Sequence, residues 1–354
     1  MIRSNYLNRS LLFLLCLGLG LISCQSDDSP TPMTSLPDVI VANEGNFGDA
    51  DGSFSTYNTV TQEAATQAFQ QENGRAINAL IQNVVLHQGE IFATTNSTDK
   101  LEIFDVSSFL SIATISSGLN TPYDFAASGL KGYVSNWGSF NATTIAYEEG
   151  FVAVIDLRDY TISKQIDRAT RPQGLLVAND KLYVTNVDAS SVSVYNTVND
   201  EFITDISVSD NPDKMVLDRN NKIWVLCNSG NLVRIDPASD QVEATITGIQ
   251  ASGFNEKMIT NGSRDKLYYL SSTGFDPSTG AVYEFDISAI SAPTIPVATG
   301  NNFYGIGLDP DENILYVSNN NAFQGTGTVI RYQLDGTEID NFVAGRGPNG
   351  FIFR

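Results

Sequence analysis

Hydrophobic and polar residues alternate along most of this 354-residue chain, in short runs separated by turn-forming residues. The clearest stretch, Arg171–Val208, holds four such runs: Gly174–Val177, Lys181–Thr185, Ser191–Tyr195 and Glu201–Ile206. Alternation with period two predicts strands, and the short Asn- and Asp-rich turns between them predict an antiparallel meander. A lone four-stranded sheet cannot bury both of its faces, so we expect this unit to recur.

The run that predicts the second strand recurs seven times, at Ile40–Asn43, Phe92–Thr95, Tyr133–Asn136, Tyr183–Asn186, Trp224–Cys227, Tyr268–Ser271 and Tyr316–Asn319. The end of the third-strand run also recurs seven times, at Tyr57-Asn58, Phe104-Asp105, Ile155-Asp156, Tyr195-Asn196, Ile235-Asp236, Phe285-Asp286 and Tyr332-Gln333. Neighbouring copies lie about 40 to 50 residues apart, which is the length of a propeller blade. The pattern therefore predicts an all-β fold, a seven-bladed β-propeller with four-stranded antiparallel blades.

The two ends of the repeat region predict how the ring closes. Pro348–Phe353 matches Pro172–Val177, the first strand of the clearest copy, and the chain then ends at Arg354. The first copy begins at Val39 with a second strand and has no first strand of its own. We therefore expect the C-terminal strand to complete the first blade, which removes the open sheet edges. Residues 38–354 form one predicted domain, in which 61–81 is the least regular part and could hold a short helix or a wandering fourth strand.

The first 37 residues have a different composition. Arg3 and Arg9 precede an apolar run, Leu11–Ile22, that is short for a membrane span, and Cys24 follows. Leu21–Cys24 resembles the bacterial lipobox, in which the cysteine is lipidated; the alternative is an ordinary signal peptide with an incidental cysteine. We predict a lipoprotein signal peptide over residues 1–23.

A Ser-, Pro- and Thr-rich stretch follows the cysteine, and residues 24–37 are predicted to be a lipidated flexible linker. Its Ser26-Asp27-Asp28 resembles the surface-export signal of Bacteroidetes lipoproteins, and the alternative is a soluble tether. The expected location is the cell outer membrane, with the protein anchored at Cys24 and facing the exterior.

Charge and cysteine content narrow the classes of partner. The net charge of −20 becomes −22 when residues 1–23, with their two arginines, are removed. An acidic surface argues against binding to nucleic acid phosphates or to anionic lipid. Loss of Cys16 with the signal and lipidation of Cys24 leave Cys227 alone, so we expect packing rather than disulfides to stabilise a monomeric domain.

The repeat also predicts where a site lies, because the loops entering each first strand surround the mouth of the central channel. The position of Gln173 recurs in every copy and gives a ring of polar residues with two arginines beside it: Gln82, Tyr123, Gln173, Asp213, Glu256, Tyr304 and Asn349, with Arg171 and Arg346. These are candidate ligand contacts. The alternative is a solvated polar plug of the channel.

Loops between second and third strands open on the same face, and four of them are long: Asn43–Gly52, Asn136–Gly150, Ser271–Gly280 and Asn319–Gly327. Aromatic rings beside amides suit a planar or sugar-like ligand. The candidate contacts come from the NEGNFG and SNWGSF stretches: Asn43, Glu44, Asn46, Phe47, Asn136, Trp137 and Phe140. The alternative is that the aromatic residues pack under their own loops, which we favour for Phe275 and Phe323.

Catalytic chemistry finds little support in the sequence. His87 is the single histidine and falls on a predicted turn. A Ser-His-Asp or Cys-His site therefore has no other histidine to act as its base, and a His-rich metal site is excluded. Cys227 is expected in the core. Asp49–Gly52 and Asp309–Asn313 only faintly resemble calcium loops. Asp213 and Glu256 could perform acid–base work but nothing distinguishes them from a solvated mouth. We expect no enzyme, metal or cofactor.

The aromatic-Val-x-Asn strands, the hydrophobic-Asp strands and the Pro-x-Gly motifs resemble those of the YncE-like seven-bladed propellers. The opening VANEGNFGDADGSFSTYN behind a lipobox resembles Bacteroidetes surface lipoproteins of that group, including the BtuG-type proteins. The resemblance implies a non-enzymatic binding propeller that captures a corrinoid-like nutrient for a TonB-dependent transporter, with the ligand over the mouth. The alternatives are a protein–protein interaction module of the envelope and a metal-dependent lactonase or hydrolase.

Overall fold

The computed structural model describes residues 36–167, 169–250, 257–273 and 279–354. Residues 36–354 form one compact unit. Its described part is built almost wholly of strands, with one α-helix, α1 (Ala68–Asn73), and two 3-10 turns, η1 (Val187–Ala189) and η2 (Asn321–Phe323). No helix in the described ranges is long and apolar enough to cross a membrane.

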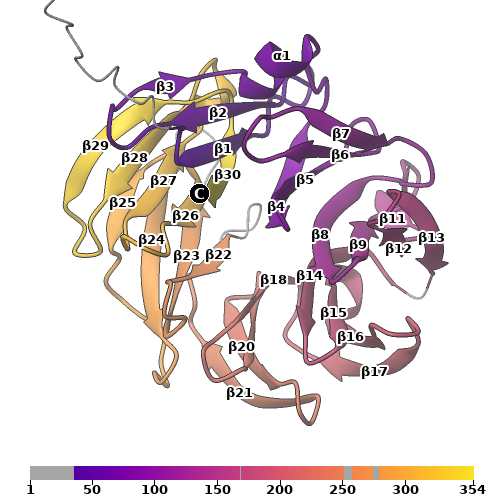
Figure 1. Cartoon of the computed structure of the whole chain (residues 1–354). Helices are drawn as coiled ribbons and strands as arrows, with labels where there is room; N and C mark the ends of the chain where they lie inside the picture. Colours follow the sequence, from indigo (N-terminus) through magenta and orange to yellow (C-terminus); the bar gives the residue numbers. More distant parts are fainter. Residues whose placement is uncertain (1–35, 168, 251–256, 274–278) are drawn as a thin grey trace, which may run out of the picture. The chain divides into compact units, whose positions relative to one another are not determined.

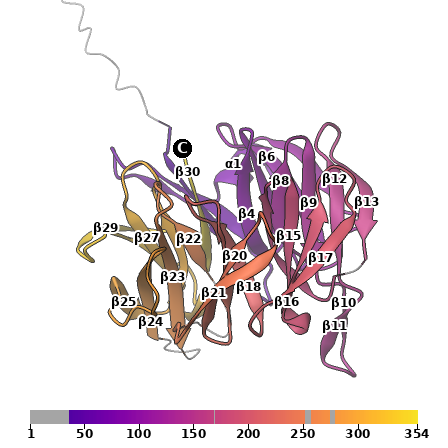
Figure 2. The ribbon, with the colours of Figure 1, turned by 90° about the horizontal axis from the view of Figure 1, so that it is seen from below.

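Seven four-stranded antiparallel sheets form the blades of a β-propeller, which confirms the predicted fold (Figure 1). From the channel outward, the first three blades are β30 (Pro348–Phe353), β1 (Val39–Asn43), β2 (Ser53–Tyr57) and β3 (Ala64–Ala65); β4 (Ile81–His87), β5 (Glu90–Thr95), β6 (Lys100–Asp105) and β7 (Ser111–Ile115); and β8 (Pro122–Ser128), β9 (Lys131–Asn136), β12 (Phe151–Asp156) and β13 (Thr161–Ile166). A separate hairpin, β10 (Ser139–Asn141) and β11 (Ala146–Glu148), lies between β9 and β12 and projects beyond the blades at one face of the ring (Figure 2).

The fourth and fifth blades are β14 (Pro172–Ala178), β15 (Lys181–Asn186), β16 (Ser191–Asn196) and β17 (Phe202–Ser207); and β18 (Pro212–Leu217), β19 (Ile223–Cys227), β20 (Asn231–Asp236) and β21 (Gln241–Thr247). The sixth and seventh are β22 (Met258–Thr260), β23 (Lys266–Thr273), β24 (Thr279–Asp286) and β25 (Ala298–Asn301); and β26 (Phe303–Leu308), β27 (Leu315–Asn319), β28 (Thr328–Tyr332) and β29 (Glu338–Val343). The fourth blade matches the strands expected from the alternation to within about two residues.

The ring closes through β30, as expected from the sequence. β30 pairs antiparallel with β1, with Val39 opposite Phe353 and Ala42 opposite Gly350. Figure 1 shows the C-terminal strand in yellow beside the indigo N-terminal strand. The first blade is thereby made from both ends of the domain, and its inner strand has a partner like those of the other blades.

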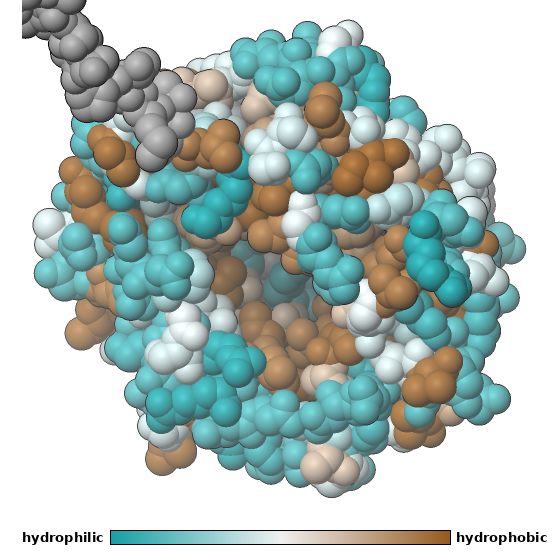
Figure 3. Space-filling model, in the orientation of Figure 1, coloured by the Kyte–Doolittle hydropathy of each residue, from teal (hydrophilic) through white to brown (hydrophobic). Residues whose placement is uncertain are grey.

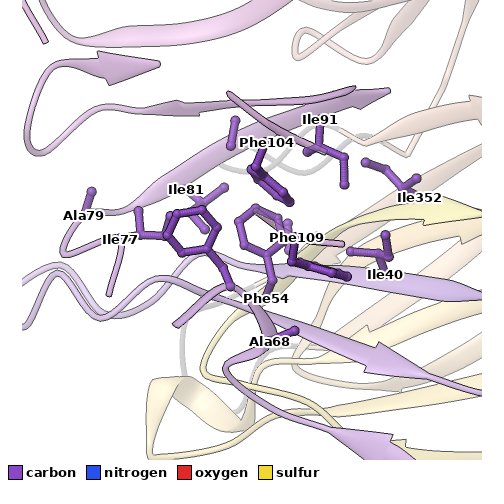
Figure 4. Close-up of a cluster of buried hydrophobic side chains, with 13 residues drawn as sticks. Ile40, Phe54, Ala68, Ile77, Ala79, Ile81, Ile91, Phe104, Phe109 and Ile352 are labelled. Atoms are coloured by element: carbon purple, nitrogen blue, oxygen red, sulfur yellow. The ribbon is translucent and has the colours of Figure 1, made fainter. Parts of the chain in front are cut away.

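The irregular part of the first blade contains both of the expected elements. β3 is a two-residue fourth strand, and α1 follows it. α1 buries Phe69 against the interface of the first two blades, where Phe54 and Phe104 meet edge to face with ring centroids 4.9 Å apart (Figure 4). Each buried phenylalanine contributes about 1.5–3 kcal/mol to stability by leaving water, so this cluster ties α1 to the ring.

Every neighbouring pair of blades shares a hydrophobic cluster of this kind. Hydrogen bonds between blades supplement these hydrophobic clusters. Tyr133 donates to Asp200 at 3.0 Å, and Tyr183 in the next blade donates to Asp240 at 2.8 Å. Burial raises the pKa of both phenols, and the neighbouring carboxylates raise it further. In the third and fourth blades, the tyrosine of the second-strand motif thus fastens its blade to the next one. Cys227 is buried in the core, as expected.

Candidate functional site

A cavity of about 330 Å³ lies at the centre of the ring, between the inner strands of the blades. In the space-filling view the centre of the ring is hollowed, with hydrophobic residues on its wall and hydrophilic residues deeper inside (Figure 3). Its volume is at the lower end of the range for small-molecule sites. The cavity is therefore the place where a small ligand could be enclosed.

The first layer of its wall is the predicted ring. Six of the ring residues, one from each of six inner strands, line the cavity: Gln82, Tyr123, Gln173, Asp213, Tyr304 and Asn349. In each of these blades the pairing of first and second strands is irregular at this position, for example between Pro172 and Leu175. A bulge leaves these residues outside the ladder and redirects their side chains. The seventh, Glu256, lies outside the described residues.

The second-strand motif explains how these bulges are held. Thr185 Oγ1 accepts the Gly174 amide at 2.7 Å and donates to the carbonyl of Asp213 in the next blade at 3.0 Å. Ser135 forms the same pair of bonds with the Asp124 amide and the Gln173 carbonyl, at 2.9 and 2.8 Å. The hydroxyl before the asparagine of these motif copies therefore fixes one blade's mouth residue against the next blade.

A second layer of polar side chains lies one position further along the same strands and was not predicted. It consists of Asn83, Asp124, Lys214 and Lys257. Asp124 is buried and accepts hydrogen bonds from Asn83, from the Phe125 amide at 2.8 Å and from the Leu175 amide at 3.0 Å. The ammonium group of Lys214 lies 3.5 Å from Asp124 Oδ2. The cavity is thus charged as well as polar.

Glu44 reaches the cavity from the loop between β1 and β2, and the sequence placed it among the candidates. Its carboxylate accepts hydrogen bonds from Tyr304 and, at 3.1 Å, from Gln82 Nε2. Burial raises the pKa of Glu44, while the Tyr304 hydrogen bond and the charge of Lys257 act in the opposite direction. Burial, reinforced by the nearby charge of Glu44, raises the pKa of the Tyr304 phenol well above its usual range.

Burial also shifts the pKa values of Asp213 and Lys257, which line the same cavity. It raises the pKa of Asp213 to about 6, against the hydrogen bond from Gln173 and the charges of Lys214 and Lys257. It lowers the pKa of Lys257 to about 8, and the neighbouring charge of Lys214 lowers it further. Both side chains are therefore held in a site that opposes their charged forms.

The aromatic residues of the long third-blade loop pack on one another. Trp137 stacks on Tyr123 with ring centroids 4.5 Å apart, and Tyr147 meets the edge of its ring at 4.8 Å. The guanidinium of Arg171 lies 5.6 Å from the Trp137 ring and pairs with Asp188 at 3.1 Å. Trp137 therefore supports Tyr123, which is itself part of the cavity wall. Phe140 packs on Tyr147 and remains 56% exposed.

The other loop candidates lie away from the cavity wall. Asn43 and Asn136 are fully buried, and their amides bond within their own blades, to Ser55 Oγ at 3.0 Å and to the Val134 carbonyl at 2.9 Å. Phe47 is 89% exposed on its loop. Asn46 donates to Asp49 at 3.0 Å. The two buried asparagines therefore stabilise their blades and do not face the cavity.

Arg346 takes the place of a cation in the loop that faintly resembled a calcium site. It pairs with Asp49 and, at 3.1 Å, with Asp51. Asp309 accepts the amides of Asp311 and Glu312, as in an ordinary turn. Within the described ranges, no group of three or more His, Cys, Asp or Glu residues is arranged to hold a metal ion. Cys24 and Phe275 lie outside the described residues. Phe323, which we expected to pack under its own loop, instead meets Tyr304 of the cavity wall edge to face.

The sequence pattern of one protein family covers most of this propeller. The family is DUF5074, described as a domain of unknown function, and the match spans residues 38–343. The chain belongs to the DUF5074 family. No curated protein matches it.

Solved structures extend the comparison for the fold. A quinonprotein alcohol dehydrogenase-like protein from Bacteroides thetaiotaomicron is 16% identical, with a TM-score of 0.70 over 90% of this chain and 78% of that one. A proposed 6-phosphogluconolactonase from Bacteroides uniformis is 14% identical, with a TM-score of 0.67 over 90% of this chain and 100% of that one. A functionally unknown protein from Desulfotomaculum acetoxidans is 10% identical, with a TM-score of 0.67 over 90% and 98%. This DUF5074 chain thus shares its propeller fold with these proteins, and its function has to be argued from its own site.

Proposed function

We propose that this DUF5074 propeller is a non-enzymatic binding protein whose central cavity encloses a small polar ligand. The observation that carries the proposal is the wall itself. Amides, phenols, carboxylates and two ammonium groups from different blades converge on one cavity of about 330 Å³. Recognition sites of this size combine a few placed polar groups with an apolar lining, and Val84, Phe125 and Met258 supply apolar wall here.

The cavity favours a compact ligand over the corrinoid that the family resemblance implies. A corrinoid is larger than an enclosed space of about 330 Å³ and would have to lie over the mouth. There it would meet the exposed rings of Phe47 and Phe140. The two ligand classes therefore make different predictions about which residues matter.

We further propose that the protein is anchored to the outer membrane through Cys24 and faces the exterior. The lipobox-like Leu21–Cys24 and the acidic residues that follow support this location. A captured ligand would then be passed to an outer-membrane transporter of the TonB-dependent class. The alternative partner is another envelope protein that docks on the mouth face.

Calorimetric titration of the protein with amino acids, sugar acids, oligosaccharides and corrinoids tests the proposal. For a ligand inside the cavity, Lys214→Met should weaken binding about 10-fold or more, because a charged hydrogen bond is lost. Phe47→Ser should leave the affinity unchanged. Lys164→Met is the matched control, since Lys164 is exposed on the outer strand β13.

The opposite pattern would place the ligand over the mouth. Loss of binding in Phe47→Ser together with full affinity in Lys214→Met would contradict the cavity as the site and favour a corrinoid-like ligand. Absence of binding by every compound in the panel, with an envelope protein retained on the mouth face, would replace ligand capture by protein docking.

A further inference from the structure

The basic side of the cavity consists of two lysines on neighbouring inner strands. Lys214 on β18 has Asp124 as its partner, at 3.5 Å. The carboxylate of Asp124 already accepts hydrogen bonds from Asn83 and from the amides of Phe125 and Leu175. Its capacity to neutralise a second cation is therefore small.

Lys257 lies directly before β22, and its ammonium group forms no ion pair with a carboxylate of the described residues. The burial of Lys257 and the closeness of Lys214 lower the pKa of Lys257 to about 8, while the more distant charges of Glu44, Asp213 and Asp124 raise it. Two ammonium groups held near each other in this way form a binding site for a negatively charged group.

Acceptors line another part of the same wall. Asn349 is buried, and its Nδ2 donates to the Ile81 carbonyl at 2.9 Å. Its Oδ1 is also buried but accepts no hydrogen bond from a described residue. Glu44 also lines the cavity, and a hydrogen bond with Asn349 acts to lower the pKa of its carboxyl group. A buried acceptor without a donor costs stability, and a ligand N–H group would satisfy it.

Charge balance narrows the ligand further. Lys214 and Lys257 share the cavity with Asp124, Asp213 and Glu44, and burial raises the pKa of the latter two carboxyl groups. Two ammonium groups and three carboxyl groups thus share the described part of the wall, and their charges largely offset one another. A simple anion would add a charge beside buried carboxylates, and a simple cation would add one beside two lysines. A ligand that carries both charges adds none.

We infer that the ligand is a small zwitterion of the amino-acid type, with its carboxylate between Lys214 and Lys257 and its ammonium group at Glu44 and Asn349 Oδ1. This inference rests on the proposed function and names the class of ligand for the same cavity. The two lysines would bind the carboxylate and Glu44 with Asn349 would bind the ammonium group, so the two contacts can be tested separately.

The test is a calorimetric comparison of chemically matched probes. The protein is titrated with the standard L-amino acids and, for each amino acid that binds, with its des-amino acid and its decarboxylated amine. Loss of either charge from the probe should weaken binding about 10- to 100-fold. Lys257→Met should weaken binding of the amino acid by a similar factor and leave the decarboxylated amine unaffected.

Glu44→Gln should give the converse result, weakening the amino acid and leaving the des-amino acid unaffected. This crossed pattern isolates each contact in the manner of a double-mutant cycle. Lys164→Met serves again as the control, and thermal unfolding of each variant shows that the ring has formed.

Other outcomes separate the inference from the proposed function. Equal affinity for the amino acid and its des-amino acid overturns the zwitterion and leaves an anion site. Binding of a sugar acid or oligosaccharide that depends on Lys214, without binding of any amino acid, overturns the zwitterion and keeps the cavity as the site. Amino-acid binding that is unchanged in both Lys257→Met and Glu44→Gln overturns the assigned contacts.

Discussion

Lys257 is a residue at which the requirements of stability and of binding conflict. An ammonium group loses hydration on burial, and a second ammonium group nearby adds repulsion. Both effects lower the pKa of Lys257 to about 8, which means that the folded protein opposes the charged form. Because a binding site needs that charge at neutral pH, we expect the side chain to cost stability where it provides affinity.

Replacing Lys257 by methionine should therefore stabilise the empty protein at pH 7. The folded-state pKa of about 8 lies below the ordinary value of 10.5, so the charged form costs stability below pH 8. This cost disappears between pH 8 and 10.5, as the lysine becomes neutral first in the folded and then in the unfolded chain. Lys257→Met should raise the free energy of unfolding by about 1–3 kcal/mol at pH 7.

Urea denaturation at several pH values measures this difference. The advantage of Lys257→Met should shrink as the pH rises from 8 towards 10.5. A variant less stable than the wild type at pH 7, or an advantage independent of pH, would contradict the electrostatic account.

The residue scale also shows why half of the cavity wall was missed from the sequence. The clearest repeat served as the template, and the position after Gln173 in it is Gly174. A Cβ at Gly174 would lie 2.2 Å from the Asp213 carbonyl oxygen, so the close approach of β18 requires glycine there. A template without a side chain gave no reason to examine Lys214 and Lys257, which occupy that position in the next two blades.

At the scale of the element, the inner strands are the parts on which the site depends. β4, β8, β14 and β18 each carry both wall positions at their irregular starts. β30 is the strand that joins the ends of the domain, with Ile352 in the cluster shared by the first two blades. Its loss would expose β1 and open the wall at Asn349.

Deletion of residues 350–354 should therefore lower the free energy of unfolding by on the order of 5 kcal/mol, because buried side chains and ladder hydrogen bonds are lost together. Thermal or urea unfolding measures the loss. Ile352→Val keeps the strand and should cost only about 1 kcal/mol. An unchanged unfolding midpoint in the truncated protein would show that closure through β30 is not needed.

Elements were predictable to the extent that they repeat. The alternation and the Tyr-Val-Ser/Thr-Asn motif place β9, β14 and β15 correctly, because the motif positions have the same physical tasks in these blades. The β10–β11 hairpin was not predicted as strands, since Ser139–Asn141 and Ala146–Glu148 are short and rich in polar residues. Its aromatic rings stabilise the hairpin and Tyr123, a use that alternation alone does not reveal.

At the scale of the whole molecule, the repeat determines the fold but leaves the ligand open. Seven copies of one blade can close in few ways, which is why sequence and structure agree on the architecture. The site depends on side chains that differ between copies, and relatives 10–16% identical share only the fold. The proposed lipid anchor at Cys24 belongs to this scale too, because it would determine the compartment from which the cavity takes its ligand.

Substitution of Cys24 by serine tests the lipid anchor. If Cys24 carries the lipid anchor, the wild-type protein should label with fatty acid and sediment with outer membranes, whereas Cys24→Ser should do neither. Accessibility to external protease on whole cells then measures the outward orientation. Membrane sedimentation of Cys24→Ser equal to that of the wild type would contradict anchoring through this cysteine.

A crystal structure of the protein with the amino acid that binds most tightly tests the central claim most directly. The account predicts ligand density inside the central cavity, with the carboxylate in contact with Lys257 Nζ and the ammonium group in contact with Glu44 and Asn349 Oδ1. Ligand density over the mouth against Phe47 and Phe140, with the cavity holding only water, would contradict it.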